Sequence, residues 1–314
     1  MPTAKTAAYG EASIRVLKGL EPVKQRPGMY TRTDNPLHIV QEVIDNAADE
    51  ALAGFGQRIG VILHADGSVT VDDDGRGIPF GLHPEEQVPV LEIVYTRLHA
   101  GGKFDKGAGG AYSFSGGLHG VGVSVTNALS RRLQVASFRE GQVATLAFAG
   151  GDVCEKLALR KAAAGDRKHG TSVRTWPDAK YFESPELPRA ELVHLLRSKA
   201  VLMPGVTVSL TVEKAGQKEP EHHEWKYAAG LRDYLKKNEP QFLTQFTRKL
   251  LGYALGRQTL PSDKKLLQQM QTSLKANGGH FSAAVLEIVK SRQFLNRRAE
   301  PQVAALPPPT PKAK

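Results

Sequence analysis

The sequence predicts an α+β fold in which helices pack on one face of a sheet. Segments with helical periodicity and segments with alternating apolar and polar residues follow one another along the first three quarters of the chain. At 314 residues, with 40% hydrophobic and 24% charged residues, the chain can form an ordinary hydrophobic core. Helices and antiparallel strands in this order are typical of an α+β sandwich.

The first elements are placed by start, stop and turn signals. Residues 1–20 are predicted to form an arm followed by a short helix. A long helix begins at Asp34-Asn35-Pro36, where a capping residue precedes a proline in the first turn, and it runs to about residue 53. Two strands follow at 59–64 and 69–72, and residues 65–68 between them read as a hairpin turn.

The later elements follow from the same periodicities. Helices are predicted at 88–99, 121–129 and 189–199, and strands at 133–138, 143–148, 171–176 and 206–212. Past residue 237 the chain reads as helical, at 241–257, 264–275 and 281–294. The Pro- and Ala-rich end at 304–314 is predicted to be disordered.

Composition excludes several classes of protein. No apolar run approaches the ~20 residues that a membrane helix needs. The N-terminus lacks the apolar segment of a secretory signal. Cys154 is the single cysteine, which rules out an internal disulfide and a cysteine-based zinc site. We therefore expect a cytoplasmic protein with no membrane partner.

The net charge of +10 is confined to the end of the chain. Residues 236–314 contain 14 Lys and Arg against 4 Asp and Glu, whereas the first 235 residues contain 28 of each sign. A basic tail is more often a solvated extension than a specific reader of DNA.

The helix at 37–53 carries the first group of candidate site residues. Glu42, Asn46, Asp49 and Glu50 follow helical spacing and lie along one face. A solvated acidic face is the plain interpretation. However, asparagine is a poor helix former in mid-helix, which favours a functional reason for Asn46. An amide oxygen can ligate Mg²⁺, and a carboxylate one turn away can polarise a water for attack on a phosphate.

The second group, Asp72-Asp73-Asp74-Gly75-Arg76-Gly77-Ile78-Pro79, directly follows a strand. A calcium loop would need further ligands and a glutamate at its twelfth position, and Glu85 does not fit. An aspartate beside Gly-x-Gly suits an exocyclic amine such as that of adenine, because a carboxylate only accepts hydrogen bonds. The glycines are expected to let the backbone approach a flat ring.

The third group is rich in glycine and runs directly into a helix. Gly101-Gly102-Lys103 precedes Ser115-Gly116-Gly117-Leu118-His119-Gly120-Val121-Gly122. Successive backbone N–H groups and a helix N-terminus can hold phosphate oxygens. The stretch is neither a P-loop nor a dinucleotide-binding fingerprint, because no Gly-Lys-Ser/Thr ends it and no βαβ unit surrounds it. A flexible hinge without ligand is the alternative.

These three groups, in this order, resemble the signature of the GHKL ATPases. Longer strings, including VLKGLEPVKQRPGMY at 16–30, EVIDNAADEALA at 42–53 and SGGLHGVGVSVTNALS at 115–130, are similar to B subunits of type IIA DNA topoisomerases. The passage at 30–34 is closer to topoisomerase IV than to gyrase. The resemblance covers about residues 9–237 and implies a GHKL (Bergerat) sandwich with a mixed, mostly antiparallel sheet.

The resemblance implies a role for each matching residue. Glu42 would be the general base with His38 orienting it, Asn46 would ligate Mg²⁺, and Asp73 would bind the adenine amine. The other residues implied to contact or support ATP are Tyr9, Asp49, Glu50, Arg76, Gly77, Ile78, Pro79, Lys103, Tyr112, Gly117, Leu118, His119, Gly120, Val121, Gly122, Val123 and Thr171. The cofactors implied are ATP and Mg²⁺.

The resemblance also implies partners and a cycle. ATP would join two copies into a clamp around DNA, with the N-terminal arm crossing to the other copy, and a topoisomerase A subunit would complete the full-length enzyme. The family's second domain brings a Gln-Thr-Lys loop to the γ-phosphate. The tripeptide does not occur in this sequence, so we expect a truncated protein with weak hydrolysis and no DNA cleavage alone.

Residues 241–294 resemble a different family, a domain of unknown function from large secreted, cytochrome-like proteins of planctomycetes. Two resemblances in one chain are what a fusion would produce. The expected organisation is an arm at 1–18, the ATPase domain at 19–237, a helical basic extension at 238–300 and a disordered tail at 301–314. A non-catalytic GHKL-fold module that holds nucleic acid through its basic tail is the alternative function. A histidine kinase fits less well, since Glu42 suits water activation.

Overall fold

The computed structural model describes residues 16–101, 120–216 and 219–296. The predicted site residues Tyr9, Lys103, Tyr112, Gly117, Leu118 and His119 lie outside these ranges, as does the tail from 297 onward. The chain divides into two compact units, Met1–Asp233 and Tyr234–Lys314. In the described ranges, no helix is both long enough and apolar enough to cross a lipid bilayer.

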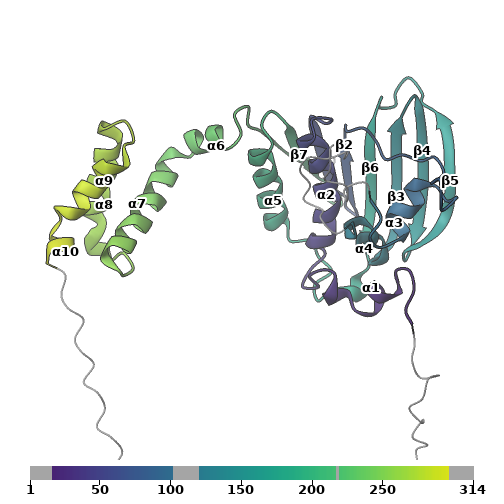
Figure 1. Ribbon diagram of the computed structural model, residues 1–314, viewed down its shortest axis with the longest axis horizontal. Coiled ribbons are helices and arrows are strands. Elements are labelled where there is room, and N and C mark those ends of the chain that lie inside the picture. Colours follow the sequence, from purple (N-terminus) through teal and green to yellow (C-terminus); the bar gives the residue numbers. More distant parts are fainter. Residues whose placement is uncertain (1–15, 102–119, 217–218, 297–314) are drawn as a thin grey trace, which may run out of the picture. The chain divides into compact units, whose positions relative to one another are not determined.

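The first unit is built on an eight-stranded sheet with the order β5-β4-β3-β6-β2-β1-β7-β8 (Figure 1). Every neighbouring pair is antiparallel except β1 and β7, which run parallel. The predicted α+β class with a mixed, mostly antiparallel sheet is therefore confirmed. The strands are β1 (Arg58–Leu63), β2 (Val69–Asp73), β3 (Ser130–Arg139), β4 (Gln142–Ala149), β5 (Asp152–Lys161), β6 (Gly170–Pro177), β7 (Thr207–Val212) and β8 (Glu221–Lys226).

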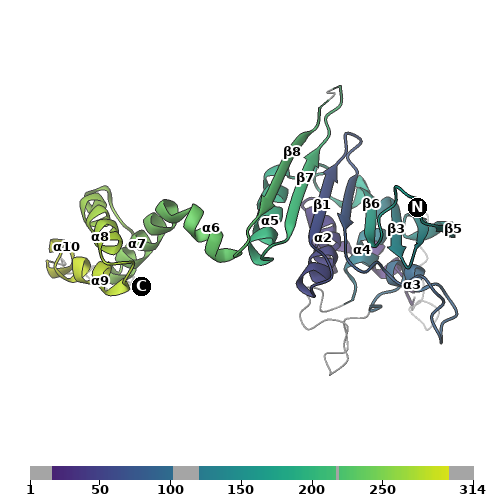
Figure 2. The same ribbon diagram turned by 90° about the horizontal axis from the view of Figure 1, so that it is seen from above.

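Helices of this unit lie against one face of the sheet, as Figures 1 and 2 show for α2, α4 and α5. Among the described residues of this unit, none forms a helix on the opposite face. A site formed between the helices and the sheet must therefore lie on the face of the sheet that the helices cover. The helices are α1 (Glu21–Gln25), α2 (Leu37–Leu52), α3 (Val90–Thr96), α4 (Gly122–Ala128) and α5 (Arg189–Leu202), with short 3₁₀ turns η2 (Pro27–Met29) and η3 (Ala179–Tyr181).

Helix α2 shows why the predicted face pattern is correct. The side-chain oxygen of Asn35 accepts a hydrogen bond from the Leu37 N–H at 3.0 Å and so satisfies one N–H of the first turn. The apolar side of α2 is buried along its whole length, at Val40, Val43, Ile44, Ala47 and Ala51. The polar residues Glu42, Asn46 and Glu50 are half-buried, and Asp49 is buried.

Two strands of the sheet were not predicted, and both are its edges. No side chain in β5 or β8 is buried, because each strand has a neighbour on one side only. An edge strand can carry charges on both faces, so the apolar alternation that marks a strand is absent. Other boundaries also differ. The short helix expected within 1–20 is α1, which begins at Glu21, and the helix predicted at 88–99 is confined to α3.

The second unit has a small helical core of its own. Its helices are α7 (Glu239–Leu255), α8 (Lys264–Ala276), α9 (Phe281–Val289) and α10 (Arg292–Leu295), with η4 (Pro261–Asp263); α6 (Leu231–Lys237) precedes them. The core residues are Leu251, Leu255, Leu266, Met270, Leu274, Ala284 and Ile288. The single helix predicted at 281–294 is divided, because the Ser291 hydroxyl oxygen accepts from the Phe294 N–H at 3.2 Å and caps α10.

Candidate functional site

The C-terminal end of β2 presents a buried carboxylate. Asp73 is only 9% exposed and pairs with Thr171 of β6 in the sheet. One of its oxygens, Oδ1, accepts hydrogen bonds from the N–H groups of Gly75 at 2.8 Å and Thr171 at 3.3 Å. Burial, together with the nearby Glu50 carboxylate, raises the pKa of Asp73 to about 6. A buried acceptor of this kind is suited to a ligand that donates a hydrogen bond.

The three consecutive aspartates point to different partners, which excludes the calcium-loop interpretation. Asp72 forms an ion pair with Arg167 at 2.8 Å. Asp74 accepts from the backbone N–H groups of Gln57 and Arg58 at 2.7 and 2.8 Å and so ties the turn to β1. Asp73 faces the side of the sheet that the helices cover, near Glu50 of α2. In the described part of the chain, no group of three or more His, Cys, Asp or Glu side chains is arranged to hold a metal ion.

Glu50 of α2 fixes the loop that follows Asp73. Its carboxylate accepts from the Arg76 backbone N–H at 2.9 Å and from the Arg76 guanidinium at 2.8 and 3.1 Å. The guanidinium carbon also lies 3.7 Å from the centre of the Phe55 ring. Glu50 therefore holds the site together rather than forming a solvated face, and Asp49 beside it is 1% exposed. Phe55 was missed; an aromatic residue between two glycines was its only signal.

The glycines of this loop serve its packing. A Cβ on Gly75 would lie 2.8 Å from Glu50 side-chain atoms, and one on Gly77 would lie 2.6 Å from the carbonyl oxygen of Phe138. Gly77 also has a φ of 75°, which other residues rarely adopt. The space on the side-chain side of both glycines is thus occupied by protein, so neither position has room for a larger residue. The Ile78 carbonyl, just before Pro79, accepts from the Ser137 hydroxyl at 2.7 Å and anchors the loop end.

The polar residues of α2 meet the start of α4. A Cβ on Gly122 would clash with a carboxylate oxygen of Glu42 and would lie 2.9 Å from its carboxyl carbon. The two helices are joined nearby, since the Thr126 hydroxyl donates to the Ile39 carbonyl at 2.8 Å. The structure thus brings Glu42 together with the described end of the glycine-rich stretch, which comprises Gly120, Val121, Gly122 and Val123.

His38 and Asn46 flank Glu42, one turn before it and one turn after it on α2. The Asn46 amide nitrogen donates to the Glu42 carbonyl at 3.0 Å, and its oxygen Oδ1 is of the type that hard cations bind. His38 Nδ1 lies 2.8 Å from the Thr31 hydroxyl. Burial, followed by the charge of Arg32, lowers the pKa of His38, so the imidazole is neutral at pH 7. The sequence reading did not single out Thr31.

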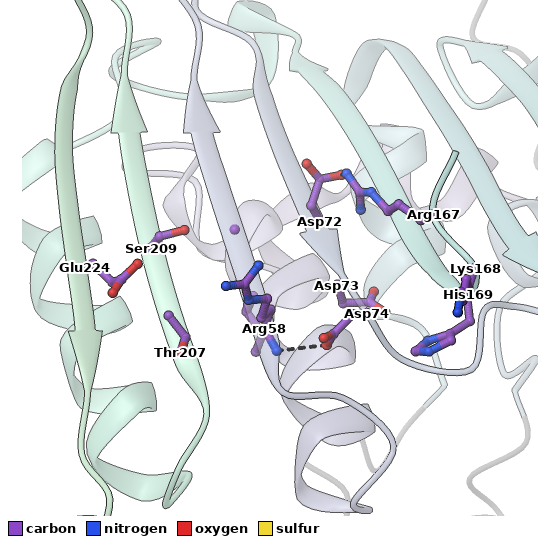
Figure 3. Close-up of a pocket in the computed structure, with 12 residues that line it drawn as sticks. Arg58, Asp72, Asp73, Asp74, Arg167, Lys168, His169, Thr207, Ser209 and Glu224 are labelled. Carbon is purple, nitrogen blue, oxygen red and sulfur yellow. Dashed lines mark hydrogen bonds and ion pairs between the residues drawn. The ribbon is translucent and has the colours of Figure 1, made fainter. Parts of the chain in front are cut away.

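A cavity of about 550 Å³ lies on the other face of the sheet, against strands β1, β2, β7 and β8 (Figure 3). Side chains alternate along a strand, so Asp72 and Asp73 face opposite sides. Part of the cavity lining is a row of residues that pair from strand to strand across the face without helices. The row consists of Asp72, Gly60, Ser209 and Glu224. Asp73, at the end of β2, also lines this cavity, so the cavity adjoins the Asp73 site.

The arrangement on the helix side corresponds to a known family. Residues 31–180, which contain every described site residue of the helix side, match the family "Histidine kinase-, DNA gyrase B-, and HSP90-like ATPase". This chain carries a GHKL ATPase domain. Within that family, it is similar to the ATPase domains of the B subunits of topoisomerase IV and gyrase.

The GHKL domain has relatives in several bacteria. The chain is 51% identical over 230 residues to the B subunit of DNA topoisomerase 4 from Salmonella typhimurium and to that from Escherichia coli; each match covers 73% of this chain. The topoisomerase IV ATP-binding domain of Francisella tularensis, solved with a small-molecule inhibitor, has a TM-score of 0.60 at 41% identity, covering 72% of this chain and 58% of that one. For the 43K ATPase domain of Thermus thermophilus gyrase B with an aminocoumarin, the TM-score is 0.59 at 35% identity, covering 69% and 54%.

The alignments with the topoisomerase subunits cover only part of this chain and only part of each relative. The chain spans about a third of the length of the topoisomerase subunits, since each alignment covers 35% of the relative. The end of the chain matches a second family, "Protein of unknown function (DUF1585)", at residues 223–294. The GHKL domain and the C-terminal helices therefore have different relatives, as the sequence indicated.

Replacing Gly122 with alanine tests the contact between α4 and Glu42. If Glu42 is the base that the sequence predicts, we expect ATP turnover to fall by roughly 10²-fold, because the added methyl group displaces the carboxylate and small misplacements of such a group are costly. Turnover and thermal stability are measured together. Gly165→Ala, where an added Cβ meets no atom within 4 Å and φ is ordinary, is the matched control. Unchanged turnover in Gly122→Ala would show that Glu42 is not used in this position.

Proposed function

We propose that this chain is a cytoplasmic, ATP-binding and ATP-hydrolysing domain of a type II DNA topoisomerase of the topoisomerase IV type. The observation that carries the proposal is the buried Asp73 carboxylate, held by Gly75 and Thr171 on the same side of the sheet as Glu42. One end of this site suits an amine donor, and the other offers a carboxylate beside a glycine-rich helix start. A nucleoside triphosphate such as ATP fits these two ends, because it carries an amine on its base and phosphates at the opposite end.

The site residues divide between the two ends of ATP. Asp73 accepts a hydrogen bond from the adenine amine, and Thr171 lies beside it in β6. Arg76, Gly77, Ile78 and Pro79 form the wall next to the base, with Asp49 and Glu50 supporting it from α2. Lys103, Tyr112 and the backbone from Gly117 through Leu118, His119, Gly120, Val121 and Gly122 to Val123 hold ribose and phosphates, and Tyr9 reaches the nucleotide of a second copy.

A magnesium ion fits the α2 end of the site. Asn46 offers a hard amide oxygen, because its nitrogen is already committed to the Glu42 carbonyl. Bound with ATP, Mg²⁺ would neutralise part of the phosphate charge. Asn46 would hold it from the protein side.

Hydrolysis depends on Glu42. Its carboxylate accepts a proton from the water that attacks the terminal phosphate, and His38 orients that carboxylate from the preceding turn. The sequence holds no Gln-Thr-Lys tripeptide to place a lysine on the γ-phosphate. Charge stabilisation of this kind is often a large catalytic contribution, so we propose that turnover by these 314 residues alone is slow.

The proposed partners follow from the relatives, which are named as topoisomerase subunits. ATP would join two copies through their N-terminal arms into a clamp on DNA. A topoisomerase A subunit would supply DNA cleavage.

Nucleotide titration with two readouts tests the proposal. We expect a non-hydrolysable ATP analogue with Mg²⁺ to bind and to shift the protein from monomer to dimer, measured by calorimetry and by sedimentation. The matching GTP analogue should bind at least about tenfold more weakly, because the guanine O6 would place an acceptor against Asp73. Absence of binding would refute the proposed function. Binding without dimerisation would refute only the clamp.

A further inference from the structure

The peptide group between Gly75 and Arg76 is held at both of its polar atoms. Its N–H, which belongs to Arg76, donates to the Glu50 carboxylate at 2.9 Å. Its carbonyl oxygen, which belongs to Gly75, lies 2.8 Å from Nδ1 of His169. The N–H and C=O of a trans peptide group point in opposite directions, so the two side chains grip it from opposite sides. His169 directly precedes β6 and lines the cavity shown in Figure 3.

The contact between His169 and Gly75 has only one possible direction. A carbonyl oxygen has no proton and can only accept, so Nδ1 of His169 must carry the proton. In the neutral ring, Nε2 is then the nitrogen with the lone pair. The charged ring also has a proton on Nδ1, so the hydrogen bond to the Gly75 carbonyl does not depend on the charge of the imidazole.

Gly75 in turn orients the carboxylate of Asp73. The Gly75 N–H donates to Asp73 Oδ1 at 2.8 Å, and the Thr171 N–H donates to the same oxygen at 3.3 Å. The shorter of these two bonds depends on the backbone of a glycine, which rotates with little steric resistance. A restraint on the Gly75 carbonyl therefore limits the rotation that would carry the N–H away from Oδ1.

We propose that His169 is a positioning residue for the adenine end of the site. By holding the Gly75 carbonyl, it keeps the Gly75 N–H on Asp73 and so fixes the carboxylate that accepts from the base. This inference rests on the proposed ATPase function. His169 acts through Gly75 and Asp73 and not on the nucleotide itself. Its loss should therefore weaken recognition of the base and leave the chemical step at Glu42 unchanged.

Two substitutions of His169 isolate the hydrogen bond. Asparagine and leucine are both uncharged and share one branched shape, but only asparagine carries an N–H donor on Cγ, where histidine carries Nδ1. NMR of the ligand-free chain, at a pH where the ring is neutral, gives the first readout. We expect the ¹⁵N shifts of His169 to show a protonated Nδ1 and an unprotonated Nε2. A neutral ring with its proton on Nε2 would overturn the proposal.

Nucleotide binding gives the second readout. The hydrogen bond is only partly buried, so His169→Leu should weaken binding of a non-hydrolysable ATP analogue by about three- to tenfold. The kcat at saturating ATP should stay within about twofold, because the bond acts on binding and not on the chemical step. His169→Asn should bind the analogue within about twofold of the unmodified chain. Lys168→Leu, which changes the neighbouring side chain in the same cavity, is the matched control and should bind normally.

Comparison of two bases separates positioning from general damage. His169→Leu should weaken the GTP analogue less than the ATP analogue, because the bond serves the acceptor for the adenine amine. The preference for ATP should therefore narrow. Unchanged ATP affinity in His169→Leu, equal losses for both analogues, or failure of His169→Asn to restore binding would overturn the inference. Failure of the unmodified chain to bind the ATP analogue would instead refute the proposed function.

Discussion

Glu42→Ala is expected to remove ATP hydrolysis, by about 10²- to 10⁴-fold, while the affinity for a non-hydrolysable ATP analogue stays within about twofold. The carboxylate takes up a proton only during the chemical step, so its loss should lower kcat and not binding. Turnover is slow in the proposed function, so the measurement requires labelled ATP and long incubation. Binding is measured separately by calorimetry.

Asp45→Asn is the matched control for this experiment. Asp45 is a carboxylate on the same helix, but it forms an ion pair with Lys199 at 2.5 Å instead of facing Gly122. We expect its substitution to leave turnover within about threefold of the unmodified chain. Turnover that survives in Glu42→Ala would disprove the assignment of Glu42 as the base, even if ATP still binds.

Asp73→Asn is expected to weaken nucleotide binding by roughly 10- to 100-fold, because a charged acceptor for the adenine amine is replaced partly by a donor. Asp72→Asn is its matched control. Asp72 is the preceding residue, faces the opposite side of the sheet and pairs with Arg167. Its substitution should leave nucleotide affinity unchanged. Equal losses in both variants would indicate damage to β2 rather than loss of a contact.

The same substitution should stabilise the ligand-free protein at neutral pH. The folded-state pKa of Asp73 is about 6, against 3.8 for the free side chain. Its contribution to stability is therefore fully present below pH 3.8 and is lost as pH rises through 6. Above that pH, Asp73→Asn should have a free energy of unfolding that is larger by on the order of 2–3 kcal/mol. It should therefore unfold at a higher temperature than the parent. Melting curves from pH 4 to 8 should show the difference between variant and parent growing with pH.

Nucleotide affinity should depend on the protonation of Asp73. As pH falls through about 6, protonation of Asp73 removes its negative charge and weakens it as an acceptor for the adenine amine, so the affinity of the unmodified chain should decrease. In Asp73→Asn, this component of the pH dependence should vanish. A pH profile that is identical in both proteins would show that Asp73 does not contact the base.

The parts of the fold that could be predicted are those with a buried face. The spacing of apolar residues in α2 and the alternation in β6 and β7 record burial directly, and the structure agrees with them. The edge strands β5 and β8 were missed because neither has a buried residue. Likewise, the break between α9 and α10 depends on one hydrogen bond of Ser291, which periodicity does not reveal.

The candidate site divides in the same way. Its residue types and spacings, from Glu42 and Asn46 to Asp73, were sufficient to indicate a GHKL ATPase from sequence alone. The three groups of site residues follow one another along the chain in the order that is typical of this family. Tertiary structure decided which residues meet: Glu50 with Arg76, Glu42 with Gly122, and Thr31 with His38. These pairs are set by how helices and loops pack on the sheet, and packing brings together residues whose separation in sequence carries no sign of their contact.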